Sequence, residues 1–378
     1  QNEAVPAADT EGSIPMKITY IDNPNGPRLG YTSAKLIEQD GLYFKDLEGT
    51  CELLPYEDWR LSPEERAEDL ARRLTVEEIA GLMMYSSHQM VPFVSGMPFR
   101  ATYGGRTFEE SGAKAWELTD QQKKFLTEDH LRHVLVMLLK DARTAALWNN
   151  EIQAFAEGLP HGLPVNISSD PRNGAAAAGA EYKSGGGQTS TWPEGLGIAA
   201  TFDPELCREY ARTIAREYRA LGIATALSPQ VDVGTEPRWM RVADTFGAHP
   251  DLVADMGRAY CDGMQSDPEQ NGGWGRGSVA AMAKHWPGGG PCEAGRDAHY
   301  AYGKFAVFPG NNLADHMKPF TEGAFRLDGP TETAAAVMPY YTISWEQDTK
   351  YGENVGNSYS RFFIHDLLRQ QENYDGVV

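Results

Sequence analysis

The sequence predicts an α/β fold of the (β/α)8 type, a TIM-like barrel, preceded by an N-terminal arm. Helical patterns and short apolar strands alternate from residue 62 onward, which indicates a parallel sheet with helical crossovers. Several strands end in polar residues, which favours a barrel over an open sheet, since barrels carry their functional groups at the carboxyl ends of their strands. The 378 residues suit one large barrel with additions.

The composition is that of a large acidic globular chain. Hydrophobic residues make up 41% of it, enough for a sizeable core, and the formal net charge is −19. A charge of this sign argues against nucleic acid or an anionic membrane as partner, whereas a neutral or cationic ligand is easier to accommodate. No apolar run approaches the roughly 18 residues of a membrane span.

The start of the chain indicates where the protein is located, and the cysteines indicate whether zinc or disulfides are expected. The polar start at Gln1 is interpreted as a mature end left after removal of a signal peptide, with a trimmed start as the alternative, and it predicts a periplasmic or secreted protein. The cysteines, at positions 51, 207, 261 and 292, form no C-x-x-C pair. Their spacing calls for neither zinc nor disulfides.

Residues 1–60 are predicted to form a turn-rich N-terminal arm. Alternation around residues 41–44 indicates a short hairpin. The segment from Asp46 to Glu57 has the length and acidic ends of a calcium-binding loop, but Cys51 occupies the position that requires glycine. A structural turn is therefore the better interpretation, and a calcium site is the alternative.

Helix starts can be recognised by their caps. Ser62, followed by proline and two acidic residues, opens one helix, and Thr75 caps the next, which runs over residues 76–85. Residues 86–130 are largely polar and contain several glycines. They are predicted to be a long insertion over a rim of the barrel.

Strands and helices then alternate to the end of the chain. The expected strands cover residues 134–138, 163–170, 224–233, 279–283 and 334–338, and the expected helices cover residues 144–157, 203–221, 251–264, 312–325 and 360–371. The clearest helix is 203–221, which carries one apolar face. Residues 374–378 begin a further strand, so the barrel is expected to be incomplete in this chain.

The most informative stretch surrounds Lys284 and His285. A small apolar strand runs into these two side chains, and an aromatic residue, a proline and three glycines follow. This pattern is typical of the carboxyl-terminal rim of a parallel β/α fold, where such folds place their chemistry. Neighbouring side chains point to opposite sides of a regular strand, so both can serve one site only where the strand ends. A surface lysine and a satisfied histidine are the alternative.

Motifs of several enzyme classes are missing from the sequence. There is no G-x-G-x-x-G after a strand, no P-loop, no G-x-S-x-G and no H-E-x-x-H. Nucleotide-binding, nucleophile-elbow hydrolase and zinc-protease interpretations therefore lose their main support, and no cofactor or metal is predicted.

Four motifs in order resemble those of glycoside hydrolase family 3, which includes many β-glucosidases and β-xylosidases. LTVEEIAGLM is similar to the family's opening motif, and GIATALSPQVDVGTEPRWMRVADTFGAHP resembles its strand and D-P-R-W-G-R-type loop. AKHWPGGG resembles its K-H-F-x-G motif, and AAAVMPYYTI its M-x-x-Y strand. Departures include Met240 for the usual glycine and Asp244 for the usual glutamate. The resemblance implies that residues 61–378 are the family's N-terminal barrel domain.

The resemblance also implies a sugar-binding site. Six residues would contact the terminal sugar: Asp170, Arg241, Lys284, His285, Met338 and Tyr341. Asp170 would accept hydrogen bonds from sugar hydroxyls, and its alternative role is that of a helix N-cap. Arg238 could bind the sugar in place of Arg241. Sugar hydroxyls both donate and accept, so fixed charges of both signs suit them.

Retaining hydrolysis is the reaction that the resemblance implies, with one carboxylate as nucleophile and a second as acid/base. The expected nucleophile is an aspartate beyond Val378, and the expected acid/base glutamate belongs to a following domain. Asp375 is not the nucleophile on this alignment. The implied partners are a glycoside or oligosaccharide and the remainder of the polypeptide, and a homodimer stays open.

Two other functions remain as alternatives to a β-glucosidase-like exo-hydrolase. Asp297 and His299 have the form of the Asp-x-His pair of β-N-acetylhexosaminidases of the same family, in a loop about two residues longer. An ordinary loop histidine is the alternative for His299. The second function is that of a sugar-binding protein without hydrolysis, which the missing carboxylates would allow.

Overall fold

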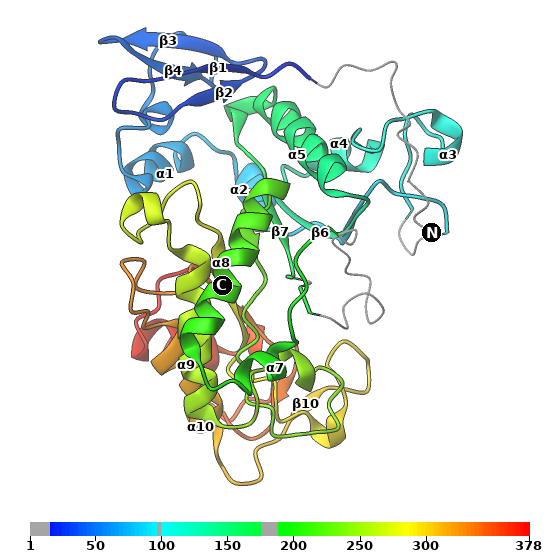
Figure 1. The fold of residues 1–378 in the computed structure, drawn as a ribbon, viewed down its shortest axis with the longest axis vertical. Coiled ribbons are helices and arrows are strands. Elements are labelled where there is room, and N and C mark those ends of the chain that lie inside the picture. The colour runs from blue at the N-terminus through cyan, green and yellow to red at the C-terminus, as the bar shows by residue number, and fades with distance from the viewer. Residues whose placement is uncertain (1–15, 97–99, 172, 175–187) are drawn as a thin grey trace, which may run out of the picture. The chain divides into compact units, whose positions relative to one another are not determined.

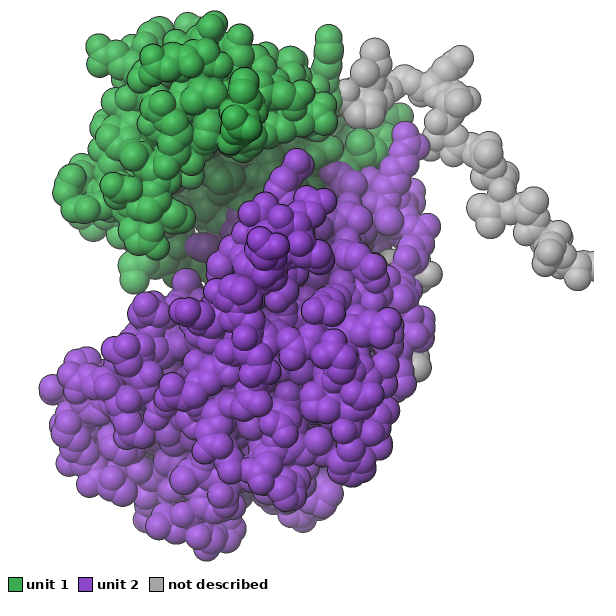
Figure 2. Space-filling model, turned by 60° about the vertical axis from the view of Figure 1, so that its left-hand side comes forward, with its two compact units in different colours: residues 1–85, 93–132, 147–165 green, residues 86–92, 133–146, 166–378 purple. Residues whose placement is uncertain are grey.

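The computed structural model describes residues 16–96, 100–171, 173–174 and 188–378 (Figure 1). It divides into two compact units, coloured separately in Figure 2. Unit 1 comprises residues 1–85, 93–132 and 147–165, and unit 2 comprises residues 86–92, 133–146 and 166–378. The predicted domain boundary between residues 60 and 61 stays a prediction.

Two small antiparallel sheets begin unit 1. Strand β1 (Thr19–Ile21) pairs with β2 (Leu29–Tyr31), and β3 (Lys35–Gln39) pairs with β4 (Leu42–Asp46). The turn between β3 and β4 consists of Asp40 and Gly41, which both have positive φ, as a two-residue type I′ turn requires. The hairpin predicted around residues 41–44 is confirmed.

The acidic segment after β4 forms a structural turn. Asp46 Oδ2 accepts a hydrogen bond from the Cys51 amide at 3.2 Å. Glu57 Oε1 accepts from the amides of Leu47 and Glu48 at 2.7 and 2.9 Å, and its Oε2 accepts from Leu54 at 3.0 Å. Backbone N–H groups therefore bind both end carboxylates of the segment.

Helices α1 (Pro63–Ala71) and α2 (Val76–Leu82) begin where the sequence predicts. The caps Ser62 and Thr75 each accept a hydrogen bond from the amide three residues later, within a capping box. Unit 1 also contains α3 (Phe108–Ser111), α4 (Asp120–Thr127) and the 3-10 turns η1 (Pro55–Glu57) and η2 (Pro160–Gly162). The segment predicted as an insertion thus holds two helices that the sequence analysis missed.

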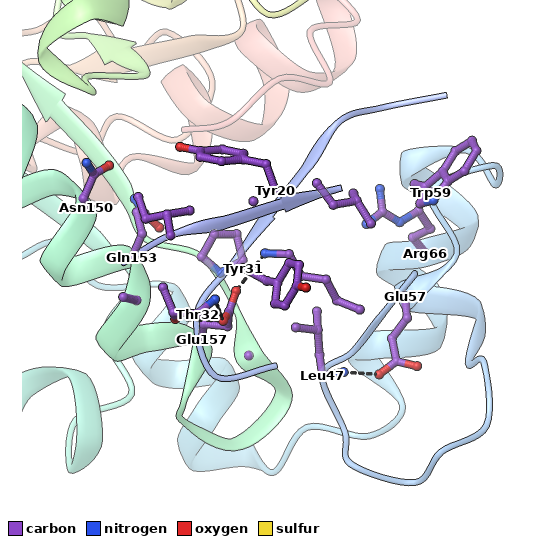
Figure 3. A pocket seen from close by; sticks show the side chains of 17 residues that line it. Tyr20, Tyr31, Thr32, Leu47, Glu57, Trp59, Arg66, Asn150, Gln153 and Glu157 are labelled. Carbon is purple, nitrogen blue, oxygen red and sulfur yellow. Dashed lines mark hydrogen bonds and ion pairs between the residues drawn. The ribbon is translucent and has the colours of Figure 1, made fainter. Parts of the chain in front are cut away.

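A buried carboxylate anchors the β2–β3 connection in unit 1. Glu157, the last residue of α5 (Ala142–Glu157), accepts hydrogen bonds from three successive amides, those of Thr32, Ser33 and Ala34, and pairs with Lys45 Nζ at 2.8 Å. Burial raises the pKa of Glu157, but these hydrogen bonds outweigh it and lower the pKa to about 2. Figure 3 shows Glu157 beside Thr32 in a cavity of about 410 Å³.

Unit 2 is built on one parallel sheet with the strand order β11-β9-β8-β7-β6-β5. Its strands are β5 (Gln89–Val91), β6 (His133–Leu139), β7 (Asn166–Ser169), β8 (Thr225–Ala226), β9 (Ala280–Trp286) and β11 (Ala336–Pro339). The predicted α/β class with a parallel sheet is confirmed. Strand β8 is shorter than the predicted 224–233, but the segment after it still pairs with β9, since the carbonyls of Ser228 and Pro229 accept from the Met282 and Lys284 amides at 3.0 Å.

Helices α8 (Pro204–Leu221) and α9 (Pro250–Gln265) pack side by side in unit 2 (Figure 1). Asp203 caps α8 by accepting from the amides of Glu205 and Leu206, and Gly222 ends it with φ 86°. A side chain at Gly263 would lie 2.4 Å from the Arg208 carbonyl oxygen, so this glycine allows the two helices to approach closely.

The later helices of unit 2 depart from regular α geometry. Helix α10 (Leu313–Lys318) continues into a π-helical turn (Pro319–Ala324), since Pro319 cannot donate a backbone hydrogen bond. The last helix (Arg361–Gln371) is π-helical throughout. The smaller elements are α7 (Gly195–Ala199), β10 (Phe305–Ala306), β12 (Ile343–Ser344) and the 3-10 turns η3 (Val242–Asp244), η4 (Pro268–Gln270), η5 (Glu293–Gly295) and η7 (Asn357–Tyr359).

Residues 374–378 lie beside β11, as predicted for the start of a strand. Val377 forms a parallel bridge with Ala336, donating to the Ala335 carbonyl at 3.1 Å and accepting from the Val337 amide at 2.9 Å. Within the described ranges, no helix has both the length and the apolar character that crossing a membrane requires.

Candidate active site

A cavity of about 350 Å³ lies at the carboxyl ends of the parallel strands of unit 2. Its lining includes all eight residues named from the sequence, which are Asp170, Arg241, Lys284, His285, Asp297, His299, Met338 and Tyr341. Unit 1 has larger cavities, but in the one of about 410 Å³ the carboxylates of Glu57 and Glu157 accept from backbone amides. The unit 2 cavity is therefore the candidate active site on chemical grounds.

Lys284 and Asp170 form an ion pair at the bottom of this cavity. Lys284 Nζ lies 2.5 Å from Asp170 Oδ1, and both side chains are largely buried. Asp170 directly follows β7, whereas Lys284 belongs to β9, so the sheet brings together two residues 114 positions apart. The alternative role of Asp170 as a helix cap depends on residues 175–187, outside the described residues.

Lys284 and His285 both line the cavity, although the strand does not end at them. The sequence predicts a strand over 279–283, but β9 runs on to Trp286, so the expected end at Lys284 is wrong. The Lys284–His285 peptide bond is cis, a feature that the sequence analysis did not predict.

His285 is held between a buried carboxylate and a buried guanidinium. Its Nδ1 lies 2.7 Å from Asp232 Oδ2, and its Nε2 lies 3.2 Å from Arg241 Nη1. Burial lowers the pKa of His285 to about 4, although Asp232 opposes this effect. The ring is therefore neutral at pH 7, and with Nδ1 donating to Asp232, Nε2 is an acceptor.

The sequence analysis missed Asp232, which is fully buried. Asp232 Oδ1 also accepts from the amides of His285 at 3.1 Å and Gly289 at 2.5 Å. A side chain at Gly289 would lie 2.8 Å from this oxygen, and one at Gly290 would lie 1.8 Å from the Val233 carbonyl oxygen. The glycines after Lys284 thus allow a close approach to the Asp232 segment. The position of Asp232 near the end of the predicted strand 224–233 could have indicated a site residue.

The structure distinguishes the two candidate arginines by their places. Arg241 is buried in the cavity wall, where its Nη2 donates to Gln230 Oε1 at 3.1 Å. Arg238 is exposed and pairs with Glu236 at 2.6 Å. Only Arg241 of the two lines the cavity.

Asp297 and His299 form a pair that faces the same cavity. Asp297 Oδ1 lies 2.6 Å from His299 Nδ1, and its Oδ2 accepts from Trp239 Nε1 at 2.7 Å and Tyr340 Oη at 3.3 Å. Burial raises the pKa of Asp297, but the hydrogen bonds from His299 and Trp239 hold that pKa well below its usual range. His299 is half exposed toward the cavity.

The described residues form no cluster suited to a metal ion, and the thiol nearest the candidate site is protonated. No group of three or more His, Cys, Asp or Glu residues is arranged to hold a metal ion in that part of the chain. All four cysteines are free thiols. Burial raises the pKa of Cys292, the thiol nearest Asp232 and Asp297, to about 12, so it is protonated at neutral pH.

Parallel strands whose carboxyl ends surround a polar cavity with buried charges of both signs are typical of an α/β domain with a site for a polar ligand. The chain belongs to glycosyl hydrolase family 3. The model of that family's N-terminal domain matches residues 78–378. This match confirms the resemblance seen in the four motifs and the TIM-barrel-like α/β class.

Several known proteins are similar to the chain. A periplasmic β-glucosidase/β-xylosidase of Dickeya chrysanthemi is 41% identical over 355 residues, covering 93% of this chain and 50% of the relative. A probable β-glucosidase C of Aspergillus oryzae is 37% identical over 325 residues, covering 85% and 46%. The chain thus spans about half the length of these relatives.

Solved structures of other proteins share the fold. A β-N-acetylglucosaminidase from Paenibacillus sp. superposes with a TM-score of 0.60 at 25% identity, covering 80% of this chain and 48% of that one. A β-glucosidase from Erythrobacter marinus superposes with a TM-score of 0.60 at 21% identity, covering 85% and 36%.

Proposed function

We propose that this chain is the sugar-binding part of an exo-acting, retaining β-glycosidase that removes terminal β-linked sugars from oligosaccharides or glycosides. The observation that carries this proposal is the convergence of Asp170, Lys284 and Arg241, all largely buried, on one cavity. The names of the relatives from Dickeya and Aspergillus support β-glucosides and β-xylosides as the substrate class.

The floor of the cavity, which we define as Asp170, Arg241, Lys284 and His285, suits the hydroxyls of one sugar ring. Asp170 accepts hydrogen bonds, Lys284 and Arg241 donate them, and neutral His285 orients the Arg241 guanidinium by accepting from it at Nε2. Hydrogen bonds to charged groups are stronger than neutral ones, and burial strengthens them further. The floor therefore binds the terminal sugar and positions its anomeric carbon for attack.

The two catalytic carboxylates of a retaining glycosidase belong, in this proposal, to the polypeptide beyond Val378. The nucleophilic aspartate is expected within about five residues of Val378, and the acid/base glutamate in a further domain, about 5 Å from it in the assembled site. Sequencing the native protein by mass spectrometry tests this placement. A native C-terminus at Val378 would contradict it.

The test of the activity uses the intact polypeptide and aryl β-glucoside as substrate. We expect Asp170→Ala to lower kcat/KM at least about 100-fold, since losing a buried charged hydrogen bond costs about 3 kcal/mol or more. Unchanged hydrolysis by this variant would mean that Asp170 does not hold the sugar. The name of the Dickeya relative supports a periplasmic location, which cell fractionation can examine.

A β-N-acetylhexosaminidase is the second candidate, because Asp297 and His299 lie 2.6 Å apart and line the same cavity. The similar Paenibacillus structure is named a β-N-acetylglucosaminidase. Faster cleavage of an aryl N-acetylglucosaminide than of the aryl glucoside, abolished by His299→Ala, would favour this candidate. Sugar binding without cleavage of either substrate would leave only the non-catalytic alternative.

A further inference from the structure

The cavity of about 410 Å³ in unit 1 is lined by residues of β1, β2, β4, η1, α1 and α5 (Figure 3). All of the lining residues belong to unit 1. The volume falls within the roughly 300–1,000 Å³ of sites that bind small molecules. Four of the lining side chains carry a charge: Lys45, Glu57, Arg66 and Glu157. The contacts of these four side chains indicate what kind of ligand the cavity can bind.

Both carboxylates of this cavity already have several hydrogen-bond donors. Glu157 Oε1 accepts from three backbone amides, and its Oε2 lies 2.8 Å from Lys45 Nζ. Glu57 Oε1 accepts from two backbone amides, and its Oε2 accepts from a third. Backbone N–H groups and one ammonium group therefore stabilise the two negative charges, and the carboxylates have little capacity left to accept hydrogen bonds from a ligand.

Arg66 differs from the other three charged residues, because its charge is not paired. Its Nε donates to the Tyr56 carbonyl at 3.1 Å, which orients the guanidinium, but its two terminal nitrogens have no hydrogen-bond or ion-pair partner among the described residues. The carboxylate of nearby Asp58 binds Arg60 through two hydrogen bonds of 2.8 and 2.7 Å, and Arg60 lowers the pKa of Asp58 more than Arg66 does. An unpaired guanidinium that lines a cavity favours an anionic ligand.

We propose that this cavity binds a small carboxylate, whose oxygens accept from the terminal nitrogens of Arg66 while the rest of the molecule packs against Tyr31. A guanidinium matches a carboxylate through two parallel hydrogen bonds. One carboxylate charge balances one unpaired cation, whereas the second charge of a phosphate would be repelled by Glu57 and Glu157. The inference does not depend on the proposed function, which concerns unit 2.

Tyr31 and Leu29 provide an apolar surface in the same cavity. They lie two positions apart on β2, so their side chains point to the same face of the strand, and both line the cavity. Figure 3 shows Tyr31 between Arg66 on one side and Gln153 on the other. The Tyr31 hydroxyl has no hydrogen-bond partner within the described ranges. A ligand that carries a ring or an apolar chain next to its carboxylate fits this combination of a cation and an aromatic ring.

Such a carboxylate can come from an acidic sugar or from a free organic acid, and the probes distinguish these two sources. Methyl β-D-glucuronide represents the first source and benzoate the second. Their neutral counterparts are methyl β-D-glucoside and benzamide, which keep the ring but lose the negative charge. Calorimetric titration of the intact polypeptide measures the affinity for all four. The two sugars are also titrated into Asp170→Ala, so that binding at the floor of the unit 2 cavity is not counted.

We expect the parent to bind at least one of the two carboxylates at least about 10-fold more tightly than its neutral counterpart, as hydrogen bonds to a charged group imply. Arg66→Gln should abolish this preference, and Arg66→Lys, which keeps the charge but not the fork, should retain part of it. Tyr31→Ala should weaken binding of the preferred carboxylate. Arg106→Gln is the matched control, because Arg106 is an exposed arginine of unit 1 that does not line the cavity, and the preference should not change.

Equal affinities of the parent for each carboxylate and its neutral counterpart would overturn the proposal, as would an equal loss of preference in Arg66→Gln and Arg106→Gln. Tighter binding of the glucuronide supports an acidic sugar as the ligand, and tighter binding of benzoate supports an organic acid. A melting temperature accompanies each variant, because Arg66 also binds the Tyr56 carbonyl. If Arg66→Gln does not fold, Arg66→Lys serves in its place, and parent-like binding by it would overturn the paired contact with the guanidinium.

Discussion

Asp232 Oδ2 lies 2.7 Å from Nδ1 of His285, and both side chains are buried. This bond keeps the proton of the neutral imidazole on Nδ1 and directs the lone pair of Nε2 toward Arg241. The floor of the cavity is therefore ordered by a carboxylate that does not itself line the cavity.

The first prediction concerns Asp232→Asn. An amide that donates to Nδ1 would place the imidazole proton on Nε2, where it would point at the N–H groups of Arg241. We expect sugar affinity to fall at least about 10-fold and the variant to remain folded with a lower melting temperature, since a buried charged hydrogen bond contributes about 1.5–3 kcal/mol. Titration with an iminosugar and thermal unfolding measure the two effects.

Asp255→Asn is the control for that experiment, because Asp255 is an exposed carboxylate on α9 of the same unit. It should bind like the parent. Parent-like affinity in Asp232→Asn would contradict the ordering role of Asp232, whatever its melting temperature.

The second prediction concerns the ion pair at the floor. Lys284→Met removes the ammonium group 2.5 Å from Asp170 and leaves a largely buried carboxylate without that cation. We expect a loss of about 3 kcal/mol in the free energy of unfolding, which Lys284→Met combined with Asp170→Asn should partly restore. Chemical denaturation of the parent, the two single variants and the double variant gives the coupling free energy.

Neither the single nor the double variant should bind the iminosugar, because the restored stability does not restore the charges that hold hydroxyls. Additive stability effects would show that the two side chains do not interact as the distance indicates. Sugar binding by the double variant would show that neither charge holds the sugar.

The third prediction concerns pH. Burial lowers the pKa of both His285 and His316 to about 4, whereas an unfolded histidine titrates near 6.5. Between these values the unfolded chain binds protons that the folded chain does not. The stability contributed by these groups is therefore complete above about pH 6.5 and declines as the pH falls toward 4.

His316 makes this prediction specific, because its Nδ1 is buried and has no hydrogen-bond partner in the described part of the chain. Between pH 6.5 and 5, the free energy of unfolding should fall less steeply in His316→Gln than in the parent. His249→Gln, at an exposed position, should keep the slope of the parent. The measurement is the free energy of unfolding at pH 7.5, 6 and 5. An equal pH dependence in all three proteins would contradict the contribution of His316.

The fourth prediction concerns Glu157 in unit 1. Glu157→Gln keeps the shape but weakens the hydrogen bonds from the amides of Thr32, Ser33 and Ala34 and removes the attraction to Lys45. We expect faster hydrogen exchange at these three amides and a loss of about 1–3 kcal/mol at pH 7. Because the folded pKa is lowered, the contribution of Glu157 is present above about pH 4.5 and is lost as the pH falls toward 2.

Glu64→Gln on α1 provides the comparison, since Glu64 is exposed and should not affect these amides. Unchanged exchange at residues 32–34 in Glu157→Gln would show that the carboxylate does not anchor the connection between β2 and β3.

Elements with strong local signals were predicted well. The starts of α1, α2 and α8 depend on capping residues within three positions of the amides that they bind, so the sequence contains the whole interaction. Strand β5 was missed because three residues carry no periodicity, and it exists only through pairing with β6. The π-helical turn after α10 follows from Pro319 but was not predicted.

The sequence by itself determined the α/β class, most helix boundaries and, through its family motifs, which polar residues to expect at one site. Only the tertiary structure decided how those residues meet. Asp170, Lys284 and Met338 are far apart along the chain, and they converge because parallel strands end at the same edge of a sheet. The role of Asp232 was likewise decided in three dimensions, since a buried carboxylate acquires its partners from packing and not from its neighbours in sequence.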